Sequence, residues 1–192
     1  IFGDWPAIDH SEFSHNLYGI NVHNADPLTS SIHLKNSRFI SNTHWAVQFD
    51  TFSEAIGTDI DADTNEATGN GGNGWYLGDG KHMTGTVTMT ATEDFPLVFG
   101  PGSLIEPDAT LTLAPGTTVK FATEGSGLNV QGQLHGVGTD GLPIVFTSIR
   151  DDDHGGDTNG DAAATSPGPS QWGNLSFPSG TQGALLEHTC IL

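Results

Sequence analysis

The sequence predicts an all-β solenoid, a fold in which short strands stack coil upon coil, and three observations lead to this prediction. Residues 8–13 (IDHSEF) align with residues 34–39 (LKNSRF) at an offset of 26. Residues 18–22 (YGINV) align with residues 45–49 (WAVQF) at an offset of 27. Residues 186–191 (LEHTCI) begin the same pattern again. Such self-similarity is typical of solenoids, whose repeats bury their apolar side chains only against neighbouring repeats.

The composition agrees with a fold made of many short strands. The 192 residues include 26 Gly and 10 Pro, and 35% are hydrophobic. Apolar runs are short and interrupted by Gly, Pro, Asn and Thr, which favours strands and tight turns over long helices. A chain of this length can bury one core, so we expect residues 1–192 to form one domain. The single cysteine, Cys190, excludes an intramolecular disulfide and is compatible with secretion.

The charge of the chain restricts its partners. Five Lys and Arg residues face 23 Asp and Glu residues, which gives a formal net charge of −18. Phosphate binding needs a basic surface, so we expect no nucleic-acid partner and no attraction to anionic lipid. The sequence contains no apolar run long enough for a transmembrane helix, and we expect no membrane insertion. A strongly acidic chain is suited to bound cations, high salt or simple solubility.

Residues 6–24 and 27–50 are predicted to form two consecutive coils. Apolar and polar residues alternate within each of them, as half-buried strands require. The alignment stacks Phe13 on Phe39 in the core. Asn16 and Asn42 fall where the strands must turn, and their side-chain amides are expected to bond to the next asparagine along the stack.

Two polar segments interrupt the strands in the rest of the chain. Residues 51–82 are rich in Asp, Asn, Thr and Gly, and we expect a loop that projects from the solenoid. Strands resume over residues 83–148. A second polar loop is expected at 149–170, and the final strand, from residue 184, begins another coil. Because that strand lacks a cap, we expect the chain to belong to a longer solenoid or stack.

Residues 109–177 resemble the right-handed parallel β-helix modules of secreted bacterial surface proteins, in the pectin-lyase-like superfamily. The segments that carry the resemblance are LTLAPGTTVKF (111–121), LHGVGT (134–139), PIVFTS (143–148), GGDTNGD (155–161) and WGNL (172–175). Residues 6–49 resemble generic coils of the same fold. The resemblance implies a right-handed parallel β-helix and an extracellular or cell-surface location. It does not imply one activity, because this superfamily includes lyases, hydrolases, adhesins and inert stalks.

Both polar segments carry alternating acidic residues that suggest calcium. Calcium takes six to eight oxygen ligands, and Asp-x-Asp spacing supplies several of them from one loop. Neither loop completes an EF-hand, and a solvated acidic loop is the alternative in both cases. The resemblance favours the second loop. The candidate ligands are Asp59, Asp61, Asp63 and Asn65 in the first loop and Asp151, Asp153, Asp157, Asn159 and Asp161 in the second.

The sequence favours a structural role over catalysis. The nine histidines show no zinc-binding spacing, the strands carry few carboxylates, and the motifs of the superfamily's hydrolases find no match. We expect a structural β-solenoid of an extracellular surface protein, adhesin or fibre, whose copies could stack end to end into a filament. The alternative is a β-helix that binds or cleaves polysaccharide. Its sugar-stacking candidates are Trp45, Trp75, Tyr76 and Trp172.

Overall fold

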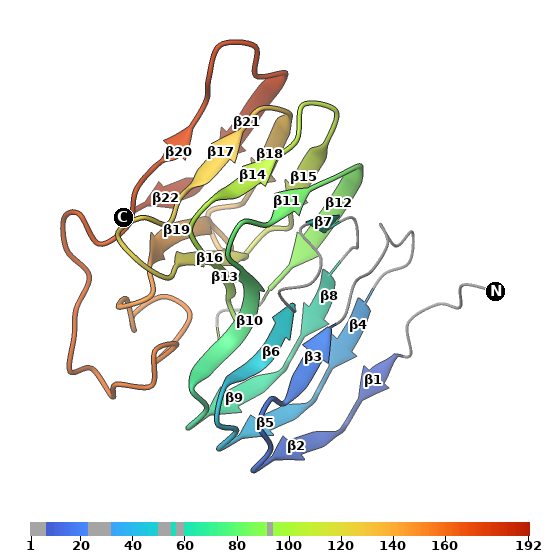
Figure 1. Ribbon diagram of the computed structural model, residues 1–192, viewed down its shortest axis with the longest axis vertical. Coiled ribbons are helices and arrows are strands. Elements are labelled where there is room, and N and C mark those ends of the chain that lie inside the picture. Colours follow the sequence, from blue (N-terminus) through green and yellow to red (C-terminus); the bar gives the residue numbers. More distant parts are fainter. Residues whose placement is uncertain (1–6, 23–31, 50–54, 57–59, 92–93) are drawn as a thin grey trace.

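The computed structural model describes residues 7–22, 32–49, 55–56, 60–91 and 94–192. In these ranges every regular element is a β-strand, and the strands pair in parallel into four sheets, which we call A to D. Successive coils of the chain each add one strand to the two seven-stranded sheets, and the two shorter sheets gain strands from only some of the coils (Figure 1). The protein is therefore a parallel β-helix, as the sequence predicted.

Sheets A and C run through every coil. Sheet A contains, in spatial order, β1 (Ile8–Asp9), β4 (Ile32–Lys35), β8 (Ile60–Asp63), β12 (Thr86–Thr90), β15 (Thr110–Leu113), β18 (Gln133–Val137) and β21 (Gly183–Glu187). Sheet C contains β3 (Ile20–Val22), β6 (Trp45–Phe49), β10 (Gly72–Gly78), β13 (Leu97–Phe99), β16 (Thr118–Phe121), β19 (Ile144–Ser148) and β22 (Thr189–Ile191).

Sheets B and D are shorter, and each runs through only part of the stack. Sheet B contains β2 (Glu12–Ser14), β5 (Arg38–Ile40) and β9 (Glu66–Thr68). Sheet D contains β7 (Ala55–Ile56), β11 (His82–Met83), β14 (Ser103–Ile105), β17 (Leu128–Val130) and β20 (Leu175–Ser176). We number the coils from their sheet A strands: coil 1 begins with β1, coil 2 with β4, coil 3 with β8, coil 4 with β12, coil 5 with β15, coil 6 with β18 and coil 7 with β21.

The register confirms the repeat that was read from the sequence. Ile8 pairs with Leu34 in sheet A, at the predicted offset of 26. Phe13 pairs with Phe39 in sheet B, and their rings stack with centroids 5.1 Å apart and planes 7° apart. Sheet C follows the predicted offset of 27 as well, since Ile20 pairs with Val47.

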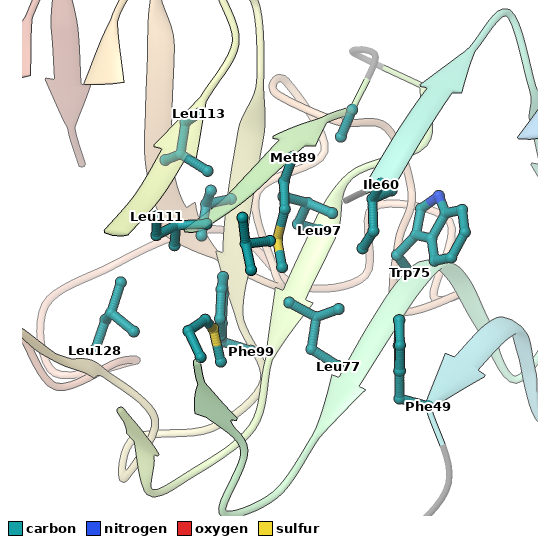
Figure 2. Close-up of a cluster of buried hydrophobic side chains, with 14 of the residues drawn as sticks. Phe49, Ile60, Trp75, Leu77, Met89, Leu97, Phe99, Leu111, Leu113 and Leu128 are labelled. Atoms are coloured by element: carbon teal, nitrogen blue, oxygen red, sulfur yellow. The ribbon is translucent and has the colours of Figure 1, made fainter. Parts of the chain in front are cut away.

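The inward side chains of successive coils form one continuous hydrophobic core (Figure 2). Strand β12 illustrates the alternation: Val87 and Met89 are buried, whereas Thr86 and Thr88 are exposed. Fully burying a side chain of this size stabilises the fold by about 1.5–3 kcal/mol. The core residues labelled in Figure 2 are Phe49, Ile60, Trp75, Leu77, Met89, Leu97, Phe99, Leu111, Leu113 and Leu128.

The loop predicted for residues 51–82 was wrong, because strands β7 to β10 lie in this range and β11 begins at its end. The acidic residues of β8 face outward, whereas Ile60 in the same strand faces the core and is only 1% exposed. The glycines allow close approach between coils: a Cβ on Gly72 would lie 2.3 Å from the ring of Trp45. A composition typical of loops therefore marks a crowded part of the stack.

The cross-section of the helix changes after coil 3. Sheet B ends with β9, and the offset between paired residues of sheet A falls from 28 (Ile32 to Ile60) to 24 (Val87 to Leu111). Phe95 closes the inner side of this step, since its ring contacts those of Phe39 and Trp75 at centroid distances of 5.4 and 6.3 Å. Coils 4 to 6 therefore pass from sheet A to sheet C without a sheet B strand.

A long connection joins β19 to β20 in coil 6. It covers residues 149–174, includes the range 149–170 predicted as a loop, and is drawn in orange at the left of the stack in Figure 1. Within the described ranges there is no helix with the length and apolar character to cross a membrane.

Candidate functional site: the acidic strap

Residues 151–161, which we call the strap, fold back from coil 6 over the outer face of sheet C. The strap starts at Asp151, whose side chain is 2% exposed. The hydroxyl of Thr147 donates to one carboxylate oxygen at 2.7 Å, and the backbone N–H of Asp153 donates to the other at 3.1 Å. Burial opposes ionisation of this carboxyl group, but the hydrogen bonds from Thr147 and His154 prevail and lower the pKa of Asp151.

A buried ammonium group holds the middle of the strap. Lys120 alternates with the core residue Phe121 along β16, so its side chain leaves the outer face of sheet C, yet it is 0% exposed. Its Nζ donates to the carbonyl oxygens of Asp151 at 2.6 Å and Gly156 at 2.8 Å, and to Oγ1 of Thr158 at 2.7 Å. All three donors of the ammonium group are therefore used.

Two opposing effects determine the pKa of Lys120. Burial disfavours the charged ammonium, while the nearby carboxylates of Asp151, Asp152 and Asp157 favour it. Burial prevails and lowers the pKa of Lys120 to about 8. The strap is therefore arranged around the ammonium group of Lys120, and the surrounding carboxylates offset only part of the cost of burying its charge.

The strap ends on a ladder of asparagine side chains that begins in coil 1. The Oδ1 atoms of Asn42 and Asn70 accept hydrogen bonds from the backbone N–H groups of Asn16 and Asn42, at 3.0 and 2.9 Å. Asn70 donates in turn to Oδ1 of Asn73 at 2.9 Å. Asn73 then donates its amide Nδ2 to the carbonyl oxygen of Asp157 at 2.7 Å. The predicted bonding between Asn16 and Asn42 is confirmed, and its extension reaches the strap.

Glycine is required where the strap crosses the sheet. Gly155 has a φ of 82°, and a Cβ at this position would lie 2.8 Å from Cε of Lys120 and 3.2 Å from Cβ of Pro96. Both the left-handed backbone and the close approach exclude a larger residue. Gly156 shares the left-handed backbone, with a φ of 63°, but a Cβ there would meet nothing within 4 Å.

Three carboxylates of the strap converge on one point. Oxygen atoms of Asp152, Asp157 and Asp161 lie within 4.8 Å of one another. Oδ1 of Asp152 is buried without a hydrogen-bond partner. Burial and the negative charges of Asp157 and Asp161 raise the pKa of Asp152. Closely spaced carboxylate oxygens are the ligands that hard cations such as calcium prefer.

This cluster includes part of the predicted second set. Asp157 and Asp161 belong to it, and Asn159 lies beside it, because its Nδ2 donates to Oδ2 of Asp161 at 2.8 Å. Asp151 and Asp153 lie outside the cluster: the carboxylate of Asp151 accepts from the Thr147 hydroxyl and from the backbone N–H of His154, and Asp153 is exposed.

Asp152 was missed, because an alternating pattern was applied to a segment that turns. The glycine pair at 155–156, both with positive φ, was the signal that extended-strand spacing does not hold here.

The predicted first set does not converge in the described residues, and Asp59 lies outside them. Asp61 projects from β8 and pairs with Nδ1 of His33 at 2.9 Å and Nζ of Lys35 at 3.2 Å. Asn65 is 2% exposed and faces the stack, where its Oδ1 accepts from the backbone N–H of Ser37 at 3.1 Å. Asp63 is exposed. The alternation that suggested a calcium loop is the outward face of a strand.

The four aromatic candidates for sugar stacking fall into separate environments. Trp75 is 0% exposed in the core, so its prediction as a sugar platform was wrong. Trp172 stacks on Phe121 with ring centroids 4.4 Å apart, and its Nε1 donates to the carbonyl oxygen of Leu192 at 2.9 Å. It fills the inner column of coil 6 and remains partly exposed.

Trp45 and Tyr76 are the two candidates that lie together. Their rings stack on the outer face of sheet C with centroids 4.5 Å apart and planes 7° apart, and both are partly exposed. The hydroxyl of Tyr76 donates to the carboxylate of Asp79. Burial and this hydrogen bond raise the pKa of Tyr76. The two rings lie parallel, one against the other, so they form one stack and not a row of three along a groove.

Comparisons of the chain with protein-family models, with curated proteins and with solved structures gave no match.

Proposed function

We propose that the protein is a non-catalytic structural β-solenoid of an extracellular surface protein or fibre. The observation that carries this proposal is the continuity of the stack. Sheets A and C each contain seven strands in unbroken parallel order, and one core runs along them. A buried asparagine ladder ties the coils together from within, and the strap ties them on the outside. Such a rod transmits force and sets a distance between its ends, which suits a stalk, an adhesin or a filament subunit.

We further propose that calcium binds the strap at Asp152, Asp157 and Asp161. The support is the convergence of three carboxylates and the buried, unpartnered oxygen of Asp152. A divalent cation would neutralise the mutual repulsion of these groups. A ligand that binds only the folded state raises stability by RT ln(1 + [L]/Kd).

Thermal unfolding in calcium and in chelator tests the calcium proposal. We expect calcium to raise the melting temperature of the wild type and to have a smaller effect on Asp157→Asn. Asp63→Asn, at an exposed carboxylate outside the cluster, serves as the matched control and should keep the full calcium response. Equal melting temperatures of the wild type with calcium and with chelator would refute the site.

The last coil supports end-to-end association. Ile191 pairs with the core residue Phe146 in sheet C and is 56% exposed. Leu185 and Leu192 are 45% and 55% exposed in the same coil. A second copy stacked head to tail would continue sheets A and C, although its first coil carries a sheet B strand, which coil 7 lacks.

Electron microscopy and sedimentation test this association. We expect fibres or concentration-dependent oligomers from the wild type, and monomers from Ile191→Asp, which places a charge in the core column of the contact. Asp153→Ala, at an exposed strap residue far from this coil in sequence, should associate like the wild type. Monomeric short rods at high concentration for the wild type would refute end-to-end stacking while leaving the rod architecture intact.

The stacked pair Trp45 and Tyr76 favours a second candidate function, polysaccharide binding. Aromatic faces stack on the apolar faces of sugar rings, and this pair is partly exposed on sheet C. Titration with acidic and neutral polysaccharides tests it. Binding that is lost in Trp45→Ala but kept in Trp172→Phe would favour this function, whereas absence of binding to either class of polysaccharide would leave the structural role.

A further inference from the structure

Coils of a solenoid normally contact only their immediate neighbours, and the strap departs from this rule because it contacts four coils. It begins in coil 6, where Asp151 accepts from Thr147 at 2.7 Å. In coil 5, Lys120 donates to the carbonyl oxygen of Gly156 at 2.8 Å. In coil 3, the backbone N–H of Asn73 donates to the carbonyl oxygen of Thr158 at 2.8 Å. A single segment of eleven residues (151–161) therefore reaches across four coils.

The contact with coil 4 is made by backbone packing. The α-carbon of Gly155 approaches coil 4 so closely that an added Cβ would lie 3.2 Å from Cβ of Pro96. Pro96 also contacts coil 3, because its carbonyl oxygen accepts from the backbone N–H of Trp75 at 2.9 Å. The strap thus covers the face of sheet C where sheet B has ended, and no coil from 3 to 6 lacks a contact with it.

We propose that the strap makes coils 3 to 6 a single cooperative unfolding unit. In a stack with nearest-neighbour contacts alone, coils open one after another from an end. Here coil 6 cannot leave coil 5 while the strap stays bound, because the strap that emerges from coil 6 is also bonded to Asn73 in coil 3. Release of the strap would break all three hydrogen bonds of the Lys120 ammonium together.

The proposal does not rest on the structural role proposed above, since it concerns the order in which coils open. It also gives Lys120 a role in positioning the strap. A lysine on the outer face of a sheet normally extends into water, whereas this one is 0% exposed and forms bonds with strap residues only.

Native-state hydrogen exchange in increasing denaturant measures the effect. We expect the slow amides of β10, β13, β16 and β19 in the wild type to share one opening free energy and one denaturant dependence. In Thr158→Val, which removes one acceptor of Lys120 and keeps the shape of the side chain, the amides of β19 should exchange at least tenfold faster than those of β10. Asn73→Ala should give the same separation through the other end of the strap.

Asp153→Ala, at an exposed strap residue, should leave the four strands exchanging together. Exchange rates that already differ from coil to coil in the wild type would overturn the proposal. So would Thr158→Val and Asn73→Ala proteins in which the four strands are accelerated equally. Thr158→Val is nearly isosteric, so the test does not depend on Asn73→Ala folding.

Discussion

Coils 1 to 3 and coils 4 to 6 are held together by different kinds of contact. Each of the first three coils contributes its own strand to sheet B, and the buried side chains of Asn42 and Asn70 each accept from the backbone N–H of an asparagine in the preceding coil. The next three coils lack sheet B and share one covering segment, the strap, which coil 6 supplies. Stability in the first region is built repeat by repeat, whereas in the second it depends on one long-range connection.

The largest effect is expected in the ladder. Asn70→Ala would remove the acceptor of two bonds from Asn42 and the donor to the carbonyl oxygen of Phe39, all in a site that is 5% exposed. Because buried partners are left unsatisfied, we expect a loss of about 3 kcal/mol in the free energy of unfolding. Urea denaturation measures it. Asn129→Ala, whose Oδ1 has no partner, is the control and should lose much less.

The strap should be somewhat less sensitive to loss of its cation. Lys120→Met would leave three acceptors unpaired but would also remove the desolvation of a charge. We therefore expect a net loss of about 2 kcal/mol at neutral pH, measured by the same denaturation. No loss at all would mean that the strap is held mainly by Asn73 and by packing.

Because the pKa of Lys120 is lowered, we expect the stability of coils 4 to 6 to depend on pH in a way that the ladder of coils 1 to 3 does not. Its pKa is about 8 in the folded protein, below its ordinary value of 10.5, so the unfolded chain binds more protons between these values. Stability should therefore rise with pH from about 8 to about 10.5. Lys120→Met should lack this rise, whereas Asn70→Ala should keep it. A wild-type stability that falls over the same window would contradict the buried position of the ammonium.

A smaller effect is expected at the crossing point of the strap. Gly155→Ala would force a Cβ to within 2.8 Å of Cε of Lys120 at a φ of 82°. We expect a loss of about 1.5 kcal/mol, from backbone strain and displaced packing together. Gly156→Ala shares the strained backbone but meets nothing within 4 Å, so it should lose less. Thermal melts of both variants compare strain alone with strain plus collision.

The smallest effect is expected from the charges on sheet B. Arg38 lies 3.5 Å from Glu12 and 3.4 Å from Glu66, and its side chain is 55% exposed. Exposed ion pairs contribute little, so Arg38→Ala should change stability by less than about 0.5 kcal/mol. A clearly larger loss, measured in low and high salt, would show that charge pairs assist the ladder in holding coils 1 to 3.

The two regions also differ in how far their structure could be predicted. Coils 1 and 2 were predictable because alternating apolar residues align directly, as Phe13 and Phe39 do. Coil 3 was not, since a strand that must pass beneath Trp45 needs glycine at position 72, and local composition then resembles a loop. Local patterns indicate which residues face inward, but not which chain segment crowds them from outside.

The strap illustrates a second limit. An alternating lysine on a strand predicts a solvated side chain, and nothing near Lys120 in sequence indicates that a segment 31 residues later will bury it. Two of the three residues of the acidic cluster were predicted. Asp157 and Asp161 were recognised by residue type, but the turn at Gly155 and Gly156 decides that Asp152 joins them. The composition indicated that carboxylates could bind a cation, but the fold of the strap determines which carboxylates lie together.

The span of the strap fixes how many coils can lie beneath it. Repeat proteins commonly change length by duplication or loss of whole repeats. Between coils 3 and 6 such a change would move Asn73 away from Asp157 by one strand spacing of about 4.8 Å, and the hydrogen bond between them could not form. We therefore expect natural or engineered length variants to gain or lose coils outside coils 3 to 6, and to keep the number of coils beneath the strap unchanged.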